Sequence, residues 1–221
     1  MSVESTAYDV VRREGPLELR RYRGYLTASV TVRADSHNDA AYSAFGVLAD
    51  YIFGNNTAQG SIPMTTPVTT SRASGTQIAM TAPVTTSRSG GTRIAMTAPV
   101  TSEHVRNEEL GVAEPLCTIG CAGEYVVRFT MPSLYRTVGE LPQPNDRRVQ
   151  LEAVPEHLAA VERFSGRLGD EMIAAATERL DSWIAESGLV ADGEPEAAQY
   201  DAPWKPGFAR RNEVIMPVRT P

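Results

Sequence analysis

The sequence contains few of the side chains that build redox or metal centres. Only two of its 221 residues are cysteines, Cys117 and Cys121. Their spacing matches neither the usual redox pair nor half of a four-ligand zinc site. We therefore expect two unreactive thiols, with a disulfide or a haem-linked redox role as the alternative.

Histidine is also scarce, with three residues in the chain. None has another histidine, a cysteine or a carboxylate at a metal-binding spacing, so a dedicated zinc or non-haem iron site is not predicted. We expect His37 to be exposed in the first turn of a helix, His104 to lie in a polar loop and His157 to begin a strand.

Long apolar runs are missing as well. No segment approaches the ~20 apolar residues that cross a bilayer, and residues 1–6 lack the features of a signal peptide. The net charge of −6 and the pI near 5.2 differ from the basic face typical of nucleic-acid-binding proteins. The expectation is a cytoplasmic protein with no membrane span and no nucleic-acid partner, and its oligomeric state is left open.

Common catalytic motifs are absent. The sequence has no Gly-x-Ser-x-Gly elbow, no Walker loop, no Gly-x-Gly-x-x-Gly after a strand and no Cys–His couple with a third member. Catalytic residues are therefore left unassigned, and the sequence favours a protein that is not an enzyme.

The chain contains three near-copies of one seven-residue motif, sixteen residues apart, at 62–68, 78–84 and 94–100. The last two copies read Ile-Ala-Met-Thr-Ala-Pro-Val. Each copy alternates as a strand does, and the polar, glycine-containing runs between them suit hairpin turns. A proline inside each copy removes a hydrogen-bond donor, which favours an edge, a bulge or a rim. We interpret residues 61–101 as a tandem repeat insertion in which one copy has the structural role.

The rest of the chain alternates strands with two helices. Ser36 is the expected N-cap of a first helix that ends near Gly54, and a second helix should cover 170–187 before Gly188. The apolar face expected for the first helix consists of Ala41, Ala44, Phe45, Leu48, Tyr51 and Ile52. Strands are predicted at 8–13, 17–22, 26–32, 125–131, 149–153, 158–164, 199–200 and 213–218.

This pattern predicts an α+β fold with an antiparallel sheet or a distorted barrel, each half of the chain carrying one helix. A single domain over 1–221 is expected, because this length can bury one substantial core and no long linker interrupts it. The space between a curved sheet and two amphipathic helices is where we expect a small-molecule ligand.

Five blocks, in order, resemble the SOUL haem-binding protein family. They are 51–55, the Ile-Ala-Met-Thr-Ala-Pro-Val phrase, 141–149, Val-Glu-Arg-Phe-Ser-Gly at 161–166, and 200–214 with its Pro-Trp-Lys-Pro-Gly. The resemblance spans 8–218. It implies a distorted antiparallel β-barrel flanked by two α-helices and built from two similar halves. It also implies kinship in fold with the effector-binding domains of bacterial transcription regulators.

The resemblance implies non-covalent binding of haem or a related tetrapyrrole in an apolar groove, as a carrier or buffer. One alternative is a haem-degrading enzyme that uses peroxide or oxygen at the bound iron. Another is effector-type binding of a different apolar small molecule. Haem needs an apolar slot, cations for two propionates and, when bound tightly, an axial His, Met, Cys or Tyr.

The candidate haem-contacting residues under this resemblance are Phe45, Leu48, Tyr51, Ile52, Met80, Met96, Trp204, Lys205 and Arg210. Lys205 matches a basic position of a mammalian relative, whereas Tyr42 and Asp50 replace two helix positions that can be basic there. Arg21 replaces the histidine of one branch of the family. The methionines of the repeats could offer a thioether to the iron, although core filling is their commoner role.

The C-terminal segment combines aromatic and basic residues. Tyr200, Trp204 and Phe208 are expected to cluster beside Arg210 and Arg211. The favoured interpretation is a packed segment whose arginines pair with nearby carboxylates, those of residues 201 or 213. The functional interpretation is a lid over the groove, with the arginines at anionic groups of the ligand.

Overall fold

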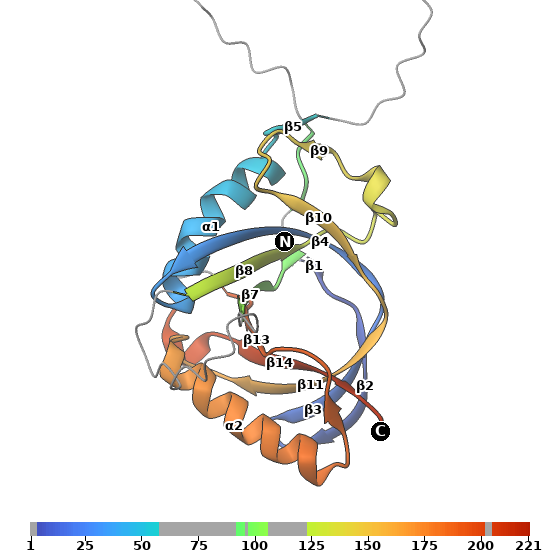
Figure 1. Cartoon of the computed structure of the whole chain (residues 1–221), viewed down its shortest axis with the longest axis vertical. Helices are drawn as coiled ribbons and strands as arrows, with labels where there is room; N and C mark the ends of the chain where they lie inside the picture. The colour runs from blue at the N-terminus through green and yellow to red at the C-terminus, as the bar shows by residue number, and fades with distance from the viewer. Residues whose placement is uncertain (1–3, 58–91, 96, 106–122, 202–204) are drawn as a thin grey trace, which may run out of the picture.

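The computed structural model describes residues 4–57, 92–95, 97–105, 123–201 and 205–221 (Figure 1). Its helices are α1 (His37–Ile52) and α2 (Asp170–Glu186), with short 3-10 helices η1 (Val138–Glu140) and η2 (Gly207–Ala209). The strands are β1 (Glu4–Ser5), β2 (Tyr8–Glu14), β3 (Leu17–Tyr22), β4 (Tyr25–Ala34), β5 (Asn56–Thr57), β6 (Thr97–Ala98), β7 (Val100–Val105), β8 (Gly123–Thr130), β9 (Gln143–Pro144), β10 (Gln150–Val154), β11 (His157–Phe164), β12 (Val190–Ala191), β13 (Glu196–Gln199) and β14 (Asn212–Arg219).

The main sheet has the strand order β10-β4-β8-β7-β13-β14-β11-β3-β2, with β12 beside β14. Every pairing in it is antiparallel. The same connectivity occurs twice, because β4, α1, β7 and β8 follow one another as β11, α2, β13 and β14 do. The sheet curves strongly (Figure 1). Its end strands β10 and β2 do not pair in the described residues, so the architecture is an open, curved α+β sheet and no closed barrel is seen.

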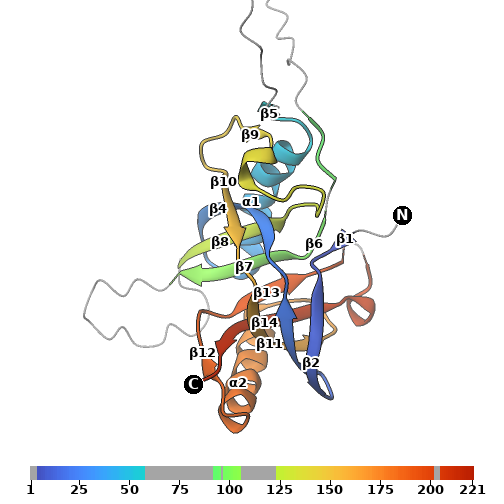
Figure 2. The ribbon, with the colours of Figure 1, turned by 90° about the vertical axis from the view of Figure 1, so that its right-hand side faces the viewer.

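One helix covers each half of the sheet (Figures 1 and 2). The helix α1 packs on β4, β7 and β8, and α2 packs on β11 and β14. The core under α1 includes Leu26, Val30, Leu48, Val127 and Phe129. The core under α2 includes Ala160, Ile173, Leu180, Trp183, Val214 and Met216. Neither helix is long and apolar enough to cross a membrane, as far as the described residues extend.

The other face of the sheet is enclosed by its curvature and is polar in part. Leu17 and Leu19 pack in the core under α2, whereas Glu18 and Arg20 alternate with them and are buried on the opposite face. Both faces of β4 are covered along its first half. Thr27 and Ser29 lie on the enclosed face of the curved sheet, opposite the face under α1, and are 2% and 3% exposed.

Local signals placed the helices well. The Ser36 hydroxyl accepts a hydrogen bond from the Asp39 backbone N at 3.1 Å, as expected of the N-cap of α1. Gly188 follows α2 with a φ of +67°, a left-handed conformation that glycine adopts without strain. The buried face of α1 differs slightly from the expected one: Ala40 and Ala49 belong to it, whereas Phe45 is 42% exposed.

Of the three repeat copies, the structure describes the last one, except for Met96. Ile94 is buried in the core under α1, and its backbone N donates to the Ile52 carbonyl at 2.8 Å. Thr97 and Ala98 form β6 beside β1, and β7 begins two residues later. Pro99 thus falls between two strands, which agrees with its missing donor. The first two copies lie outside the described residues.

Candidate functional site

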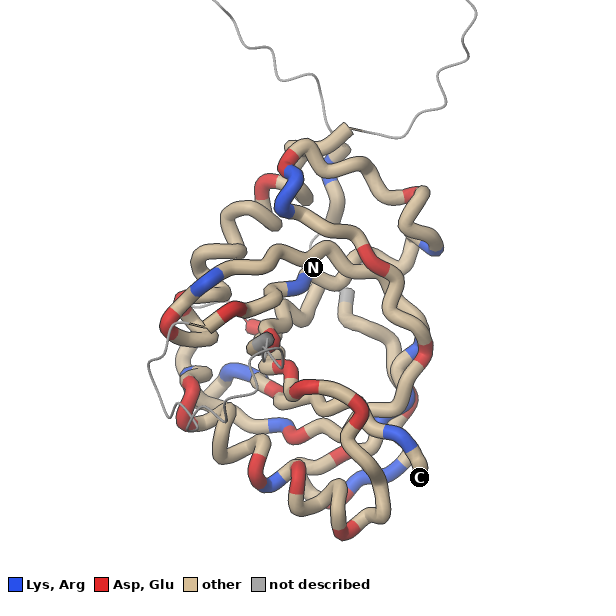
Figure 3. Tube along the Cα trace, viewed as in Figure 1, with Lys and Arg blue, Asp and Glu red and all other residues tan. Residues whose placement is uncertain are grey.

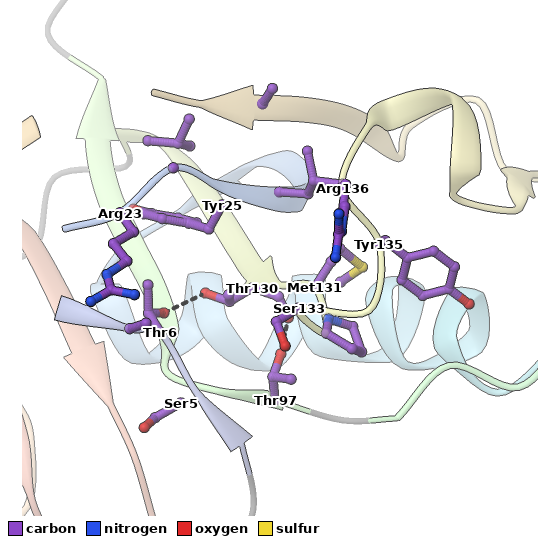
Figure 4. Close-up of a pocket in the computed structure, with 16 residues that line it drawn as sticks. Ser5, Thr6, Arg23, Tyr25, Thr97, Thr130, Met131, Ser133, Tyr135 and Arg136 are labelled. Carbon is purple, nitrogen blue, oxygen red and sulfur yellow. Dashed lines mark hydrogen bonds between the residues drawn. The ribbon is translucent and has the colours of Figure 1, made fainter. Parts of the chain in front are cut away.

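A cavity of about 440 Å³ lies where β1, the β3–β4 turn and the ends of β8 and β10 meet (Figure 4). Five separate stretches of the chain contribute to it. Its lining consists of Ser5, Thr6, Ala7, Arg23, Gly24, Tyr25, Leu26, Thr97, Thr130, Met131, Pro132, Ser133, Tyr135, Arg136, Ala153 and Val154. The volume falls in the range of small-molecule sites.

The wall of this cavity is fixed by hydrogen bonds between threonines. The hydroxyls of Thr6 and Thr130 lie 3.3 Å apart, and the Thr97 hydroxyl donates to the Thr130 carbonyl. These contacts tie the N-terminal segment and β6 to the end of β8. Apolar side chains such as Leu26 and Met131, both buried, complete the lining.

Two arginines give the cavity its charge. Arg23 Nη2 is 3.5 Å from Asp9 Oδ2, and both side chains are exposed, so solvent screens this pair. Arg136 is exposed, and its backbone N donates to a Glu140 carboxylate oxygen at 2.7 Å. Figure 4 shows the two guanidinium groups on different sides of the cavity.

Tyr25 and Met131 bring two further functional groups to the lining. Burial raises the pKa of the Tyr25 phenol, and the charge of Glu196 adds to this effect, so the phenol stays protonated at neutral pH. A thioether sulphur is a known haem-iron donor, whereas tyrosine binds the iron as a phenolate, which the raised pKa of Tyr25 disfavours. In Figure 4 the Tyr135 ring extends away from these residues.

The predicted residues on α1 separate into core and surface. Leu48, Tyr51 and Ile52 are at most 1% exposed, and the Tyr51 hydroxyl donates to the Pro142 carbonyl at 2.8 Å. Phe45 lies at the surface, with its ring 5.5 Å from that of Phe129. These core positions therefore face the sheet rather than an open groove.

An aromatic face of α1 is open to solvent. Tyr42, Phe45 and Phe53 are all exposed large side chains, and helical geometry places them on one side of the helix. Gly46 lies between them, and a Cβ built there would meet no atom within 4 Å. Of these three residues, only Phe45 was predicted from the sequence to contact haem. Tyr42 was noted only as the replacement of a position that can be basic in a relative.

The start of α1 contacts the start of α2. The His37 backbone N donates to Asp170 Oδ1 at 3.2 Å, and His37 Nδ1 lies 3.0 Å from the same oxygen. The expectation that His37 is exposed is therefore wrong. Burial lowers the pKa of His37, although the hydrogen bond and charge of Asp170 act in the opposite direction. His104 is not in a loop either: it lies in β7, with its ring 5.0 Å from that of Tyr125.

Lys205 and Arg210 are close to each other and to this junction. Lys205 Nζ lies 2.6 Å from Asp201 Oδ1, and Arg210 Nε donates to the Lys205 carbonyl at 2.7 Å. The Gly166 backbone N donates to the Gly207 carbonyl at 3.0 Å, which joins this segment to the loop before α2. The structure thus brings Lys205 and Arg210 together near the loop before α2. Met80, Met96 and Trp204 lie outside the described residues.

The C-terminal aromatic residues that are described do not form a cluster. The Tyr200 hydroxyl donates to Glu213 at 2.6 Å, whereas Phe208 is 84% exposed. The carboxylates of this segment hold Arg211, as the favoured interpretation expected: its side chain pairs with Glu213 at 2.7 Å and its backbone N donates to Asp201 at 2.6 Å.

A protein-family model described as SOUL heme-binding protein matches residues 3–76 and 87–217. The chain belongs to the SOUL heme-binding protein family. Residues 77–86, between the two matched stretches, fall inside the repeat region. No curated protein matches the sequence.

Solved structures share the SOUL chain's fold at low identity. The C-terminal domain of EcmrR has a TM-score of 0.57 and 11% identity, over 97% of this chain and 99% of that one. A hydrolase from Listeria innocua has a TM-score of 0.52 and 11% identity, over 95% and 94%. Such identities support the fold alone.

Two places in this SOUL protein offer features that a tetrapyrrole needs. The cavity combines apolar lining, two arginines and an iron-donor side chain. The exposed face of α1 offers the aromatic rings of Tyr42, Phe45 and Phe53, on which a flat macrocycle could stack. The residues of the cavity come from turns and strand ends far apart in sequence, and no sequence motif marks them.

Proposed function

We propose that this SOUL protein binds haem or a related tetrapyrrole non-covalently, as a carrier or buffer, and that the cavity of about 440 Å³ is the binding site. The observation that carries the proposal is the combination, in one cavity of a SOUL chain, of apolar lining with two arginines. Apolar burial would supply most of the affinity, and charge-assisted hydrogen bonds would orient the ligand.

Each part of the lining has a role in this proposal. Arg136 would hold a propionate, since a guanidinium fork suits a carboxylate, and Arg23 on another side of the cavity would add to its positive potential. Leu26 and Val154 would contact the macrocycle, and Met131 would offer an iron donor. Bound haem would supply an iron centre that takes up ligands or exchanges electrons. The surrounding hydroxyls of Thr6 and Thr130 already bond to each other and keep the wall in place.

The primary test is a haem titration of the purified apo-protein, followed by the Soret band. Saturation at one equivalent with a spectrum that stays stable on addition of peroxide supports a carrier. Catalytic bleaching with product release would indicate the haem-degrading alternative. The absence of a saturable shift would refute haem binding, and an apolar cation or drug-like compound would then be titrated to test the effector-type alternative.

Matched variants locate the site. We expect Arg136→Gln and Ala153→Trp to weaken haem binding about tenfold or more, the first by removing a charge-assisted hydrogen bond and the second by filling the cavity. Phe45→Ala and Lys205→Gln test the residues predicted from the sequence. Lys205 is well suited to this, because it is the one lysine of the sequence and can also be modified selectively. If only the second pair weakens binding, the residues predicted from the sequence form the site and the cavity does not.

A further inference from the structure

A second depression lies where the β2–β3 hairpin meets the end of β11 and the segment before β14. It measures about 450 Å³, and its lining consists of Arg13, Gly15, Pro16, Glu18, Arg163, Phe164, Ser165, Arg210 and Arg211. None of these residues lines the cavity proposed for the tetrapyrrole. Four of the nine are arginines, although the chain has a net charge of −6.

Buried carboxylates hold these arginines in position. Glu18 is 2% exposed and accepts a contact of 2.7 Å from Arg13 Nη2. Glu213 is fully buried and lies 2.7 Å from Arg211 Nη2 and 3.4 Å from Arg163 Nε. In Figure 3, acidic and basic positions are interspersed through the half of the molecule that contains α2.

More arginines surround these two carboxylates than are needed to neutralise their charge. Arg20, fully buried, already bonds both carboxylates, at 2.6 Å to Glu18 and at 2.8 and 2.9 Å to Glu213. With Arg13, Arg163 and Arg211 added, four guanidinium groups surround two carboxylates. Among the described residues, an excess of two positive charges remains in this group of four arginines and two glutamates. The nearby Asp201 is paired with Lys205 and leaves this balance unchanged.

The outer arginines keep donors at the surface. The side chains of Arg13, Arg163 and Arg211 are between 32% and 58% exposed, although each contacts a buried carboxylate. A guanidinium has five N–H donors in a rigid fork, so an edge that is not bonded to the carboxylate can bind a second oxyanion. The buried carboxylates fix the position of these forks in advance, which lowers the entropic cost of binding.

We propose that this arginine depression is a binding site for a compact oxyanion with two or more negative charges, either a phosphate compound or a small polycarboxylate. The open, polar rim suits a hydrated anion better than a macrocycle. The site is separate from the tetrapyrrole cavity, and the proposal does not depend on haem binding.

The test is calorimetric titration of the haem-free protein with pyrophosphate and, separately, with citrate. We expect saturation at one equivalent by at least one probe, with an affinity that falls as salt rises. The double variant Arg13→Gln/Arg163→Gln should weaken binding at least about tenfold. Arg147→Gln, which removes an exposed arginine outside the depression, should change it by less than about twofold. Tighter binding of pyrophosphate would indicate a phosphate compound as the ligand, and tighter binding of citrate a polycarboxylate.

The double variant is expected to fold, because Arg20 still pairs with both carboxylates; its circular dichroism spectrum checks this. Lack of saturation by both probes, or equal losses in the double variant and in Arg147→Gln, would overturn the proposal. Competition between haem and pyrophosphate would also overturn it, since the propionates would then occupy the depression. A failed haem titration leaves this test intact, because the probes are measured without haem.

Discussion

Replacement of Arg20 by methionine tests the buried ion network at its centre. Arg20 is fully buried and donates to Glu18, to both oxygens of Glu213 and, at 3.1 Å, to the Tyr22 hydroxyl. Methionine has a similar length but no charge and no donor. The Arg20→Met variant would therefore leave two buried carboxylates without their shared partner.

The expected loss follows from the remaining contacts. Removing one partner of a buried ion pair costs about 3–5 kcal/mol, because the other charge is left uncompensated. Glu213 keeps Arg211, and Glu18 keeps Arg13, so the loss should be near the lower limit, about 3 kcal/mol. For a chain of this length that corresponds to a fall in melting temperature of roughly 6–12 °C.

Urea unfolding followed by circular dichroism gives the free energies of unfolding. The control is Arg147→Met, at an exposed arginine, which should change the free energy of unfolding by less than about 0.5 kcal/mol. The double variant Arg20→Met/Glu213→Leu should be more stable than the sum of its single changes predicts, because the residues are directly coupled. A single Arg20→Met variant within about 1 kcal/mol of the wild type would refute the reasoning.

Three further outcomes are expected. Burial would raise the pKa of Glu213, but the hydrogen bond and charge of Arg20 prevail and lower it. The charged Glu213 therefore stabilises the fold above its unfolded pKa near 4.5, and this contribution is lost as pH falls. The difference in unfolding free energy between wild type and Glu213→Gln should shrink below about pH 4.5. A difference that stays constant with pH would contradict this. Ser36→Ala should cost about 1 kcal/mol in urea unfolding, through loss of the N-cap. Gly166→Ala should cost about 1–3 kcal/mol, because φ is +129° and the new Cβ would lie 2.9 Å from Met172 Cε; Gly139→Ala, with more room, is the control, and equal losses would argue against strain.

Local signals in the sequence were sufficient for the helices and for the strands at 8–13 and 17–22. The cap at Ser36 and the stop at Gly188 depend on residues within one turn of the helix ends, so tertiary contacts did not alter them. The strand β7 was missed, although its Val100 belongs to the repeat. Thr101 and Ser102 give it a polar pattern, and both are buried only because neighbouring strands enclose them.

The candidate site was less predictable for the same reason. The resemblance assigned Leu48, Tyr51 and Ile52 to a groove, but apolar periodicity alone cannot distinguish a ligand-facing stripe from a core-facing one. The cavity depends on the approach of residues 5–7 to residues 130–136, which no local pattern encodes. Whether the predicted residues or the cavity bind the tetrapyrrole stays a prediction for the variants above.

The repeated connectivity of the sheet has a mechanical consequence. Eight residue pairs join β4 to β8 within one half, whereas four join β7 to β13 between the halves. The cores under α1 and α2 lie on separate sides of this short seam. Fewer backbone pairs therefore join the two halves than join β4 to β8, and the contact of His37 with Asp170 between the helix starts is a second link across the seam.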